Sequence, residues 1–107
     1  MCFPEYKDME EPFVCYIYLN GGKNHEIRPC DIYDPLADFF GLTMRDRNMP
    51  RPDGYSGTIW KNRVQWLRQR LVNHGYLDGS KKGIWRLTDR GVLLASSVVA
   101  RYSNQQR

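Results

Sequence analysis

Side chains with the chemistry to bind a DNA duplex are concentrated between residues 51 and 82. Amide groups can pair with the edge of adenine, cationic groups suit guanine, and lysine and hydroxyl groups bind phosphate. We predict that five residues read base edges: Asn62, Gln65 and Gln69 on adenine, and Lys61 and Arg68 on guanine. We predict that a second set contacts phosphate: Lys81, Lys82, Ser80, Ser56 and Thr58.

Other cations have a weaker case as DNA ligands. Arg63 and Arg70 fall toward another flank of the same segment, where they either meet phosphate or are simply solvated. Arg51, with Arg45 and Arg47, contributes only if the loop that carries it folds toward DNA. An ordinary solvated face explains much of the pattern equally well, because exposed helix faces and flexible loops are often polar.

One helix and one hairpin must position these groups. The apolar spacing predicts a helix from Ile59 or Trp60 to His74, closed by Gly75 in the left-handed conformation. At about 100° per residue, one face is expected to be buried: Trp60, Val64, Leu67, Leu71 and His74. The opposite face is expected to carry Lys61, Gln65, Gln69 and Val72, with Asn62 and Arg68 at its edges.

The hairpin follows directly. Tyr76 and Leu77 begin a strand, residues 78–83 are rich in turn formers, and residues 84–87 form the return strand. A helix followed by a basic hairpin is the second half of a winged helix, in which the helix enters the major groove and the hairpin lies along the backbone. We therefore predict an α+β winged helix-turn-helix with a three-helix core, a C-terminal hairpin wing and an extra C-terminal helix.

The rest of the chain is predicted in order from its caps and breakers. Pro35 either starts the second helix late, near Asp34, or kinks it. A short strand at residues 25–27 would add a third strand to the hairpin. The expected elements are a flexible arm (1–8), a helix from Glu10 or Pro12 to Leu19, a helix from Pro29 or Asp31 to Phe40, a helical turn (42–47), a loop (48–57), a helix from Asp89 to Arg101 or Tyr102, and a polar tail (103–107), so that residues 9–102 form one domain.

Charge is unevenly distributed along the chain. Residues 1–44 carry three Lys/Arg against eight Asp/Glu, a balance of −5, whereas residues 45–90 carry eleven against four, a balance of +7. A polyanion would be attracted to the second segment. No apolar run approaches the ~20 residues that cross a bilayer, and the acidic N-terminus lacks a signal-peptide pattern. We expect a cytoplasmic, nucleoid-associated protein.

Catalytic and metal chemistry are not predicted. Cys2, Cys15 and Cys30 are widely spaced, and His25 and His74 do not match metal-ligand spacing. No nucleophile has an evident base partner, so we expect no enzyme activity and no cofactor in this chain. The three tryptophans (Trp60, Trp66 and Trp85) are expected in the core, although Trp66 and Tyr55 are conceivable parts of an aromatic cage for a flipped base.

At residues 60–91 the sequence resembles the N-terminal domain of Mrr-type restriction proteins. The resemblance rests on Asn62-Arg63-Val64, Trp66, Leu71, Gly75, Leu77, the segment GIWRLT at 83–88 and Gly91, with weaker matches at Asp31-Ile32-Tyr33, Ala37-Asp38 and Gly41-Leu42. It covers roughly Pro12 to Leu94 and implies a winged-helix DNA-binding fold. In the family this domain usually precedes a nuclease that cuts DNA with modified bases. The resemblance thus implies double-stranded DNA, with modified bases as candidates, as a partner, and a nuclease domain in cis or in trans.

A nuclease is not expected within the chain itself, because no Asp is followed by a Glu-x-Lys or Gln-x-Lys signature. Two alternative functions stay open. One is a small dimeric winged-helix transcriptional regulator, which would need a dimer surface on the last or the first helix. The other is a protein-interaction winged helix that does not bind DNA and works through its acidic first half.

Overall fold

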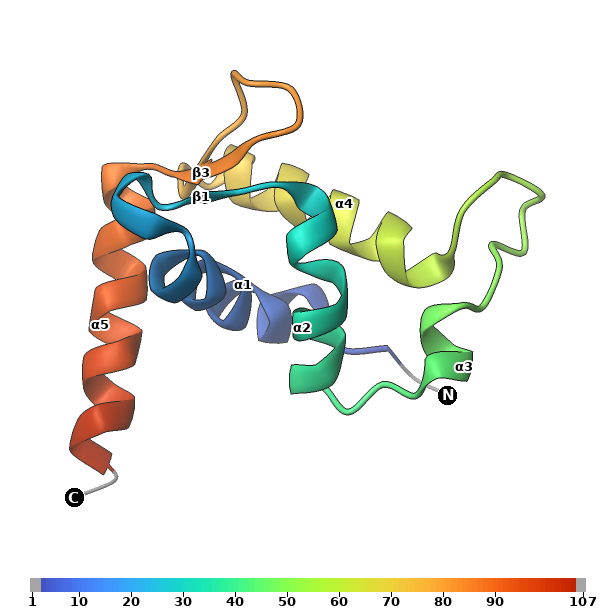
Figure 1. Cartoon of the computed structure of the whole chain (residues 1–107), viewed down its shortest axis with the longest axis horizontal. Helices are drawn as coiled ribbons and strands as arrows, with labels where there is room; N and C mark the ends of the chain where they lie inside the picture. Colours follow the sequence, from blue (N-terminus) through green and yellow to red (C-terminus); the bar gives the residue numbers. More distant parts are fainter. Residues whose placement is uncertain (1–2, 106–107) are drawn as a thin grey trace.

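The computed structural model describes residues 3–105, which form an α+β domain with helices packed against one face of a small three-stranded sheet (Figure 1). Its elements, in chain order, are α1 (Tyr6–Asn20), the 3₁₀ turn η1 (Gly22–Asn24), β1 (Glu26–Ile27), the 3₁₀ turn η2 (Pro29–Asp31), α2 (Tyr33–Phe39), α3 (Met44–Arg47), α4 (Ile59–Asn73), β2 (Leu77–Asp78), β3 (Trp85–Leu87) and α5 (Asp89–Gln105).

The sheet is antiparallel with strand order β1-β3-β2, as the predicted third strand requires. Ile27 pairs with Trp85, and Leu77 pairs with Leu87. These four side chains are buried, whereas Arg86 between them is exposed. This alternation gives the sheet one apolar face, which covers the helices, and one polar face.

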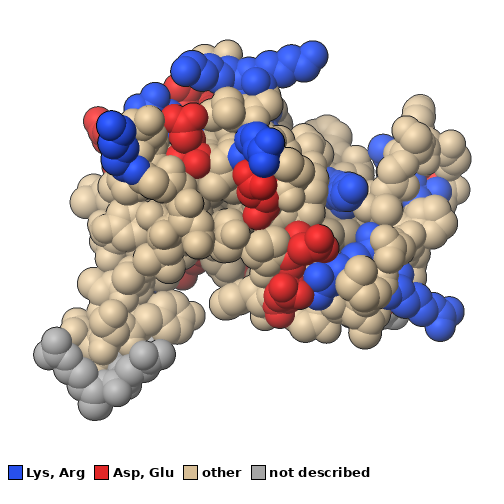
Figure 2. Space-filling view, in the orientation of Figure 1, with Lys and Arg blue, Asp and Glu red and all other residues tan. Residues whose placement is uncertain are grey.

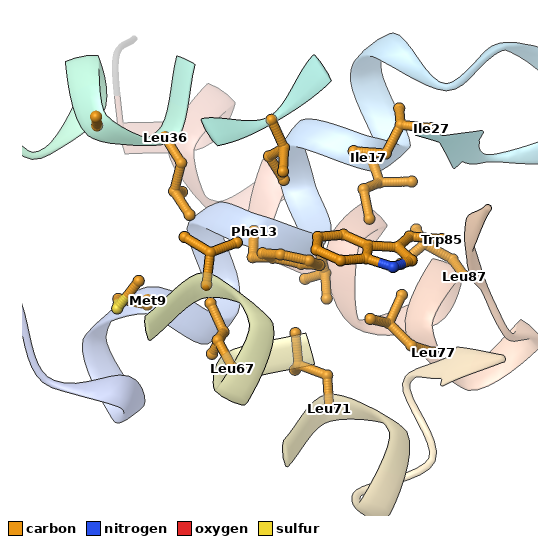
Figure 3. Close-up of a cluster of buried hydrophobic side chains, with 14 of the residues drawn as sticks. Met9, Phe13, Ile17, Ile27, Leu36, Leu67, Leu71, Leu77, Trp85 and Leu87 are labelled. Carbon is orange, nitrogen blue, oxygen red and sulfur yellow. The ribbon is translucent and has the colours of Figure 1, made fainter. Parts of the chain in front are cut away.

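The core lies between α1, α4 and the apolar face of the sheet (Figure 3). Phe13 of α1 lies at its centre, with its ring centroid 5.7 Å from that of Trp85. Leu67 and Leu71 of α4 point into the same cluster. Because these side chains of α4 are part of the core, the core fixes which side of α4 faces away from the domain.

The N-terminal segment differs from the flexible arm expected over residues 1–8; Met1 and Cys2 lie outside the described residues. α1 begins at Tyr6, and Met9 is fully buried. Phe3 stacks on Trp60 with ring centroids 6.2 Å apart. The expected start of the helix at Glu10 or Pro12 was therefore wrong, because apolar contacts distant in sequence extend it. Pro12 lies inside α1.

The second helix confirms the late-start alternative. Pro35 occupies the first turn of α2, where a missing N–H breaks no helical hydrogen bond. Leu36 and Ala37 are buried as its apolar face requires. Phe39, which was expected to face inward, is 65% exposed.

The predicted helical turn at residues 42–47 is present as α3. Thr43 and Asp46 form a reciprocal capping box, with Thr43 Oγ1 2.8 Å from Asp46 Oδ2. The following loop is irregular, as expected, but Pro50 and Thr58 form an isolated antiparallel bridge at its base. Both ends of the loop are thereby held beside the start of α4.

α5 packs mainly on α1 and extends beyond the rest of the molecule (Figure 1). It continues to Gln105, so the tail expected from residue 103 is helical at its start, while residues 106 and 107 lie outside the described part. Val98 is buried as predicted, but Tyr102 is 59% exposed because the end of α5 passes the body of the domain. In residues 3–105, no helix has the length and apolar character needed to span a membrane.

Candidate nucleic-acid interface

The start of α4 is fixed by Thr58. Its side-chain oxygen accepts a hydrogen bond from the backbone N–H of Lys61 at 3.2 Å, which is the predicted N-cap. Ser56, the other predicted cap, is exposed in the loop and does not cap the helix. Trp60 donates its indole N–H to the carbonyl of Tyr33 at 2.8 Å, which fixes this end of α4 against α2.

One flank of α4 faces α2 and the hairpin, and it gathers three of the predicted base readers. Gln65 Nε2 donates to the Tyr33 hydroxyl at 2.6 Å, and the Lys61 ammonium lies 5.5 Å from the centre of the Tyr33 ring. Arg68 donates from Nη2 to the carbonyl oxygen of Gly79 at 3.4 Å. These side chains thus lie in one row between α2 and residues 79–84, the connection between β2 and β3, called the hairpin connection below.

The outward face of α4, away from the core, carries Gln69, Asn73 and Trp66. Gln69 Nε2 donates to Asn73 Oδ1 at 3.1 Å, and Gln69 Oε1 accepts from Arg68 Nη1 at 3.3 Å. Asn62 lies on the same face and is partly covered. Val72, expected opposite the core, instead packs partly against it and beside Gly79.

Trp66 corrects the expectation that all three tryptophans are buried. Trp60 and Trp85 are 1% and 4% exposed, but Trp66 is 60% exposed. The helical period was sufficient to find this, because residue 66 falls outside the stripe set by residues 60, 64, 67 and 71. The residue type suggested burial, and the spacing was the better guide.

The third flank of α4 faces α1 and is already occupied. Arg63 Nε donates to the carbonyl of Pro4 at 2.8 Å, and its guanidinium lies 4.3 Å from the centre of the Tyr6 ring. Arg70 and His74 contact the two carboxylate oxygens of Glu10 at 3.2 and 3.0 Å. Arg63 therefore has partners within the domain and is not simply solvated, while its predicted phosphate contact stays a prediction. His74 is an exposed C-cap residue and not part of the buried stripe.

The hairpin connection presents Lys81 and Lys82. Both are exposed, and neither has an ion-pair partner within residues 3–105. Ser80 donates its backbone amide to Asp78 Oδ1 at 2.9 Å. Hydrogen bonds from the Ser80 side chain and backbone lower the pKa of Asp78, and the positive charges of nearby cations lower it further. Asp78 thus orders the connection that carries the two lysines.

The arginines of the long loop and α3 make contacts of their own. Arg51 Nη2 lies 2.7 Å from Asp53 Oδ2, and its guanidinium lies 4.9 Å from the centre of the Tyr55 ring. Arg47 is tied to α2 through Asp38 at 2.6 Å. The structure does not bring Arg51 or Arg47 onto the row formed by Lys61, Gln65 and Arg68.

In the face shown in Figure 2, Lys and Arg side chains lie over the hairpin connection at the top and over α3 and its following loop at the right. Acidic side chains lie between these two basic regions. The positive charge of residues 45–90 is therefore divided among separate places. One of these basic regions lies over the hairpin connection, which carries Lys81 and Lys82.

Comparison with known protein families decides the identity of the domain. Residues 18–97 match the family described as the Mrr N-terminal domain. The chain belongs to this family. The match begins and ends slightly later than the span of Pro12 to Leu94 expected from sequence motifs, and it associates the chain with Mrr restriction systems. No curated protein and no solved structure matches the chain significantly.

In this Mrr N-terminal domain, the matched region includes β1, β3, β2, all of α4 and the first half of α5. Within residues 3–105, His, Cys, Asp and Glu side chains do not gather in any group of three or more that could hold a metal ion. The described surface of α4 and the hairpin connection offers hydrogen-bond donors and acceptors together with the exposed Lys81 and Lys82.

Proposed function

We propose that this Mrr N-terminal domain is a winged-helix module that binds double-stranded DNA and serves as the DNA-reading part of a modification-dependent restriction system. In this proposal α4 enters the major groove, and the connection between β2 and β3 lies along the phosphate backbone as the wing. Cleavage belongs to a nuclease domain elsewhere, in cis or in trans.

The main support is the link between the helix and the hairpin. Arg68 Nη2 lies 3.4 Å from the Gly79 carbonyl oxygen and Val72 packs beside Gly79, so the hairpin connection lies directly against α4. This arrangement can place amides against base edges while Lys81 and Lys82 meet phosphate. The capped N-terminus of α4, where backbone N–H groups and the helix dipole favour anions, adds a further phosphate contact.

The test is fluorescence anisotropy of labelled duplexes across a series of salt concentrations. If four to five phosphates are neutralised, the slope of log affinity against log salt should be about −4. A matched panel with unmodified and modified cytosines and adenines tests modification preference in the same assay. Absence of salt-dependent binding would instead support a protein-interaction domain.

A dimeric regulator is the second candidate, because an apolar groove that could hold a second copy lies beside α1 and includes no residue of α4. The groove, of about 610 Å³, lies between α1, α2 and α5 and is rimmed by the exposed side chains of Leu19, Phe39 and Tyr102. The solution mass discriminates the two candidates. A monomer with a short footprint supports the reading domain, whereas a dimer on two half-sites supports the regulator.

A further inference from the structure

Trp66 is a large, exposed apolar side chain on the polar outward face of α4. It is 60% exposed, and its neighbours one helical turn away are the polar residues Asn62, Gln69 and Arg70. An isolated indole in such surroundings differs from the apolar rim of the groove between α1, α2 and α5. This face of α4 could therefore contact a partner that presents mostly hydrogen-bonding groups and one apolar group.

The major groove of DNA offers one apolar group to such a side chain. Base edges there present hydrogen-bond donors and acceptors, except at the C5 methyl of thymine. The same methyl position is substituted in 5-methylcytosine. An indole carried into the groove by α4 therefore has a pyrimidine C5 methyl as its natural apolar partner.

We propose that Trp66 is a specificity-determining residue that packs against the C5 methyl of a pyrimidine in the major groove. This inference rests on the proposed function of α4 as the recognition helix. Asn62 and Gln69, on either side of the indole along the helix, would pair with neighbouring base edges. Removing one buried methyl from the contact should reduce affinity about fourfold, from the free energy of burying a CH₂-sized group.

Tryptophan fluorescence gives a direct test, because the other two indoles are buried. Iodide should quench Trp66 in the free protein and leave Trp60 and Trp85 largely protected. Addition of a saturating 20-base-pair duplex should protect Trp66 from iodide. The Trp66→Phe variant, which lacks the exposed indole, is the control for assigning the quenched signal.

The second part of the test compares duplexes that differ only in C5 methyl groups. One pair exchanges every thymine for uracil, and the other exchanges every cytosine for 5-methylcytosine, which distinguishes the two sources of the methyl. We expect tighter binding to the methylated member of at least one pair, and loss of that difference in Trp66→Ala with the salt slope unchanged.

The outcomes separate this inference from the proposed function. If the duplex binds with the expected salt slope but iodide still quenches Trp66, the contact is refuted while DNA binding stands. If Trp66 is protected but neither methyl exchange alters affinity, methyl reading is refuted. Failure of the unsubstituted protein to bind any duplex would refute the proposed function itself.

Discussion

Arg68, in the middle of α4, donates a hydrogen bond from Nη2 to the carbonyl oxygen of Gly79, 3.4 Å away at the start of the hairpin connection. Glycine permits this close approach, since a Cβ at position 79 would lie 3.1 Å from Arg68 Nη2 and 3.3 Å from both Val72 methyl carbons. The contact joins the helix that carries the predicted base readers to the loop that carries the predicted phosphate ligands.

Replacement of both hairpin lysines should weaken binding to all duplexes alike. In Lys81→Ala with Lys82→Ala, the loss of two phosphate contacts should make the log–log salt slope less negative by about 1.8. The control is Lys7→Ala with Arg101→Ala, which removes the same charge from α1 and α5. Anisotropy at several salt concentrations measures both variants, and an equal change in the two would show that only net charge matters.

Substitution of Gln69 should change the preference among sequences. Gln69→Ala removes an amide from the outward face of α4 and should alter discrimination at one base pair by about 1–3 kcal/mol. Competition binding against a randomised duplex pool measures this preference. Asn20→Ala, at the end of α1, is the matched control. A uniform loss on every sequence would argue against base reading by Gln69.

The order of the hairpin connection should depend on pH through Asp78. The pKa of Asp78 is lowered by its hydrogen bonds to Ser80, so its carboxylate stabilises the folded connection above its unfolded pKa of about 3.9. This stabilisation is lost as the pH falls through the lower folded value. The chemical shift of the Ser80 amide should therefore titrate below pH 3.9. The same titration in Asp78→Asn should be flat, and a Ser80 titration that persists unchanged in this variant would contradict the assignment.

Because α5 packs closely on the residues before β2, we expect a Gly91→Ala substitution to lower the stability of the domain. Gly-to-Ala changes inside helices usually stabilise, but a Cβ at Gly91 would lie 2.2 Å from the carbonyl oxygen of Tyr76. Gly91→Ala should therefore destabilise the domain by roughly 1–3 kcal/mol through overpacking. Urea unfolding measures the change, with the exposed Ser97→Ala as control. A more stable Gly91→Ala protein would contradict this close contact.

Local signals were enough to predict much of the fold. The apolar period located α4, and Gly75, which has a φ of 83° in the structure, marked the point just after the end of the helix. Turn-forming residues located the hairpin, and Pro35 located the start of α2. These features depend on residues within one or two turns of each other, where propensity and capping operate.

Tertiary partners decided what sequence could not. Phe3 was assigned to a loose arm because its stacking partner, Trp60, is distant in sequence. Arg63 was predicted either to contact phosphate or to be solvated, because its hydrogen bond to the Pro4 carbonyl has no sequence signal. At the candidate site, residue types were therefore predictable, whereas the division of α4 into a free face and an occupied flank required the positions of α1 and the hairpin.

The central claim is that the exposed polar side chains of α4, which include Lys61, Gln65 and Gln69, form one surface for duplex DNA with the hairpin connection. Backbone amide shifts on titration of ¹⁵N-labelled protein with a short duplex test it most directly. We predict perturbations concentrated in residues 58–73 and 79–83, with the groove between α1, α2 and α5 unaffected. Perturbations confined to α1 and α5, or absent at saturating duplex, would contradict the account.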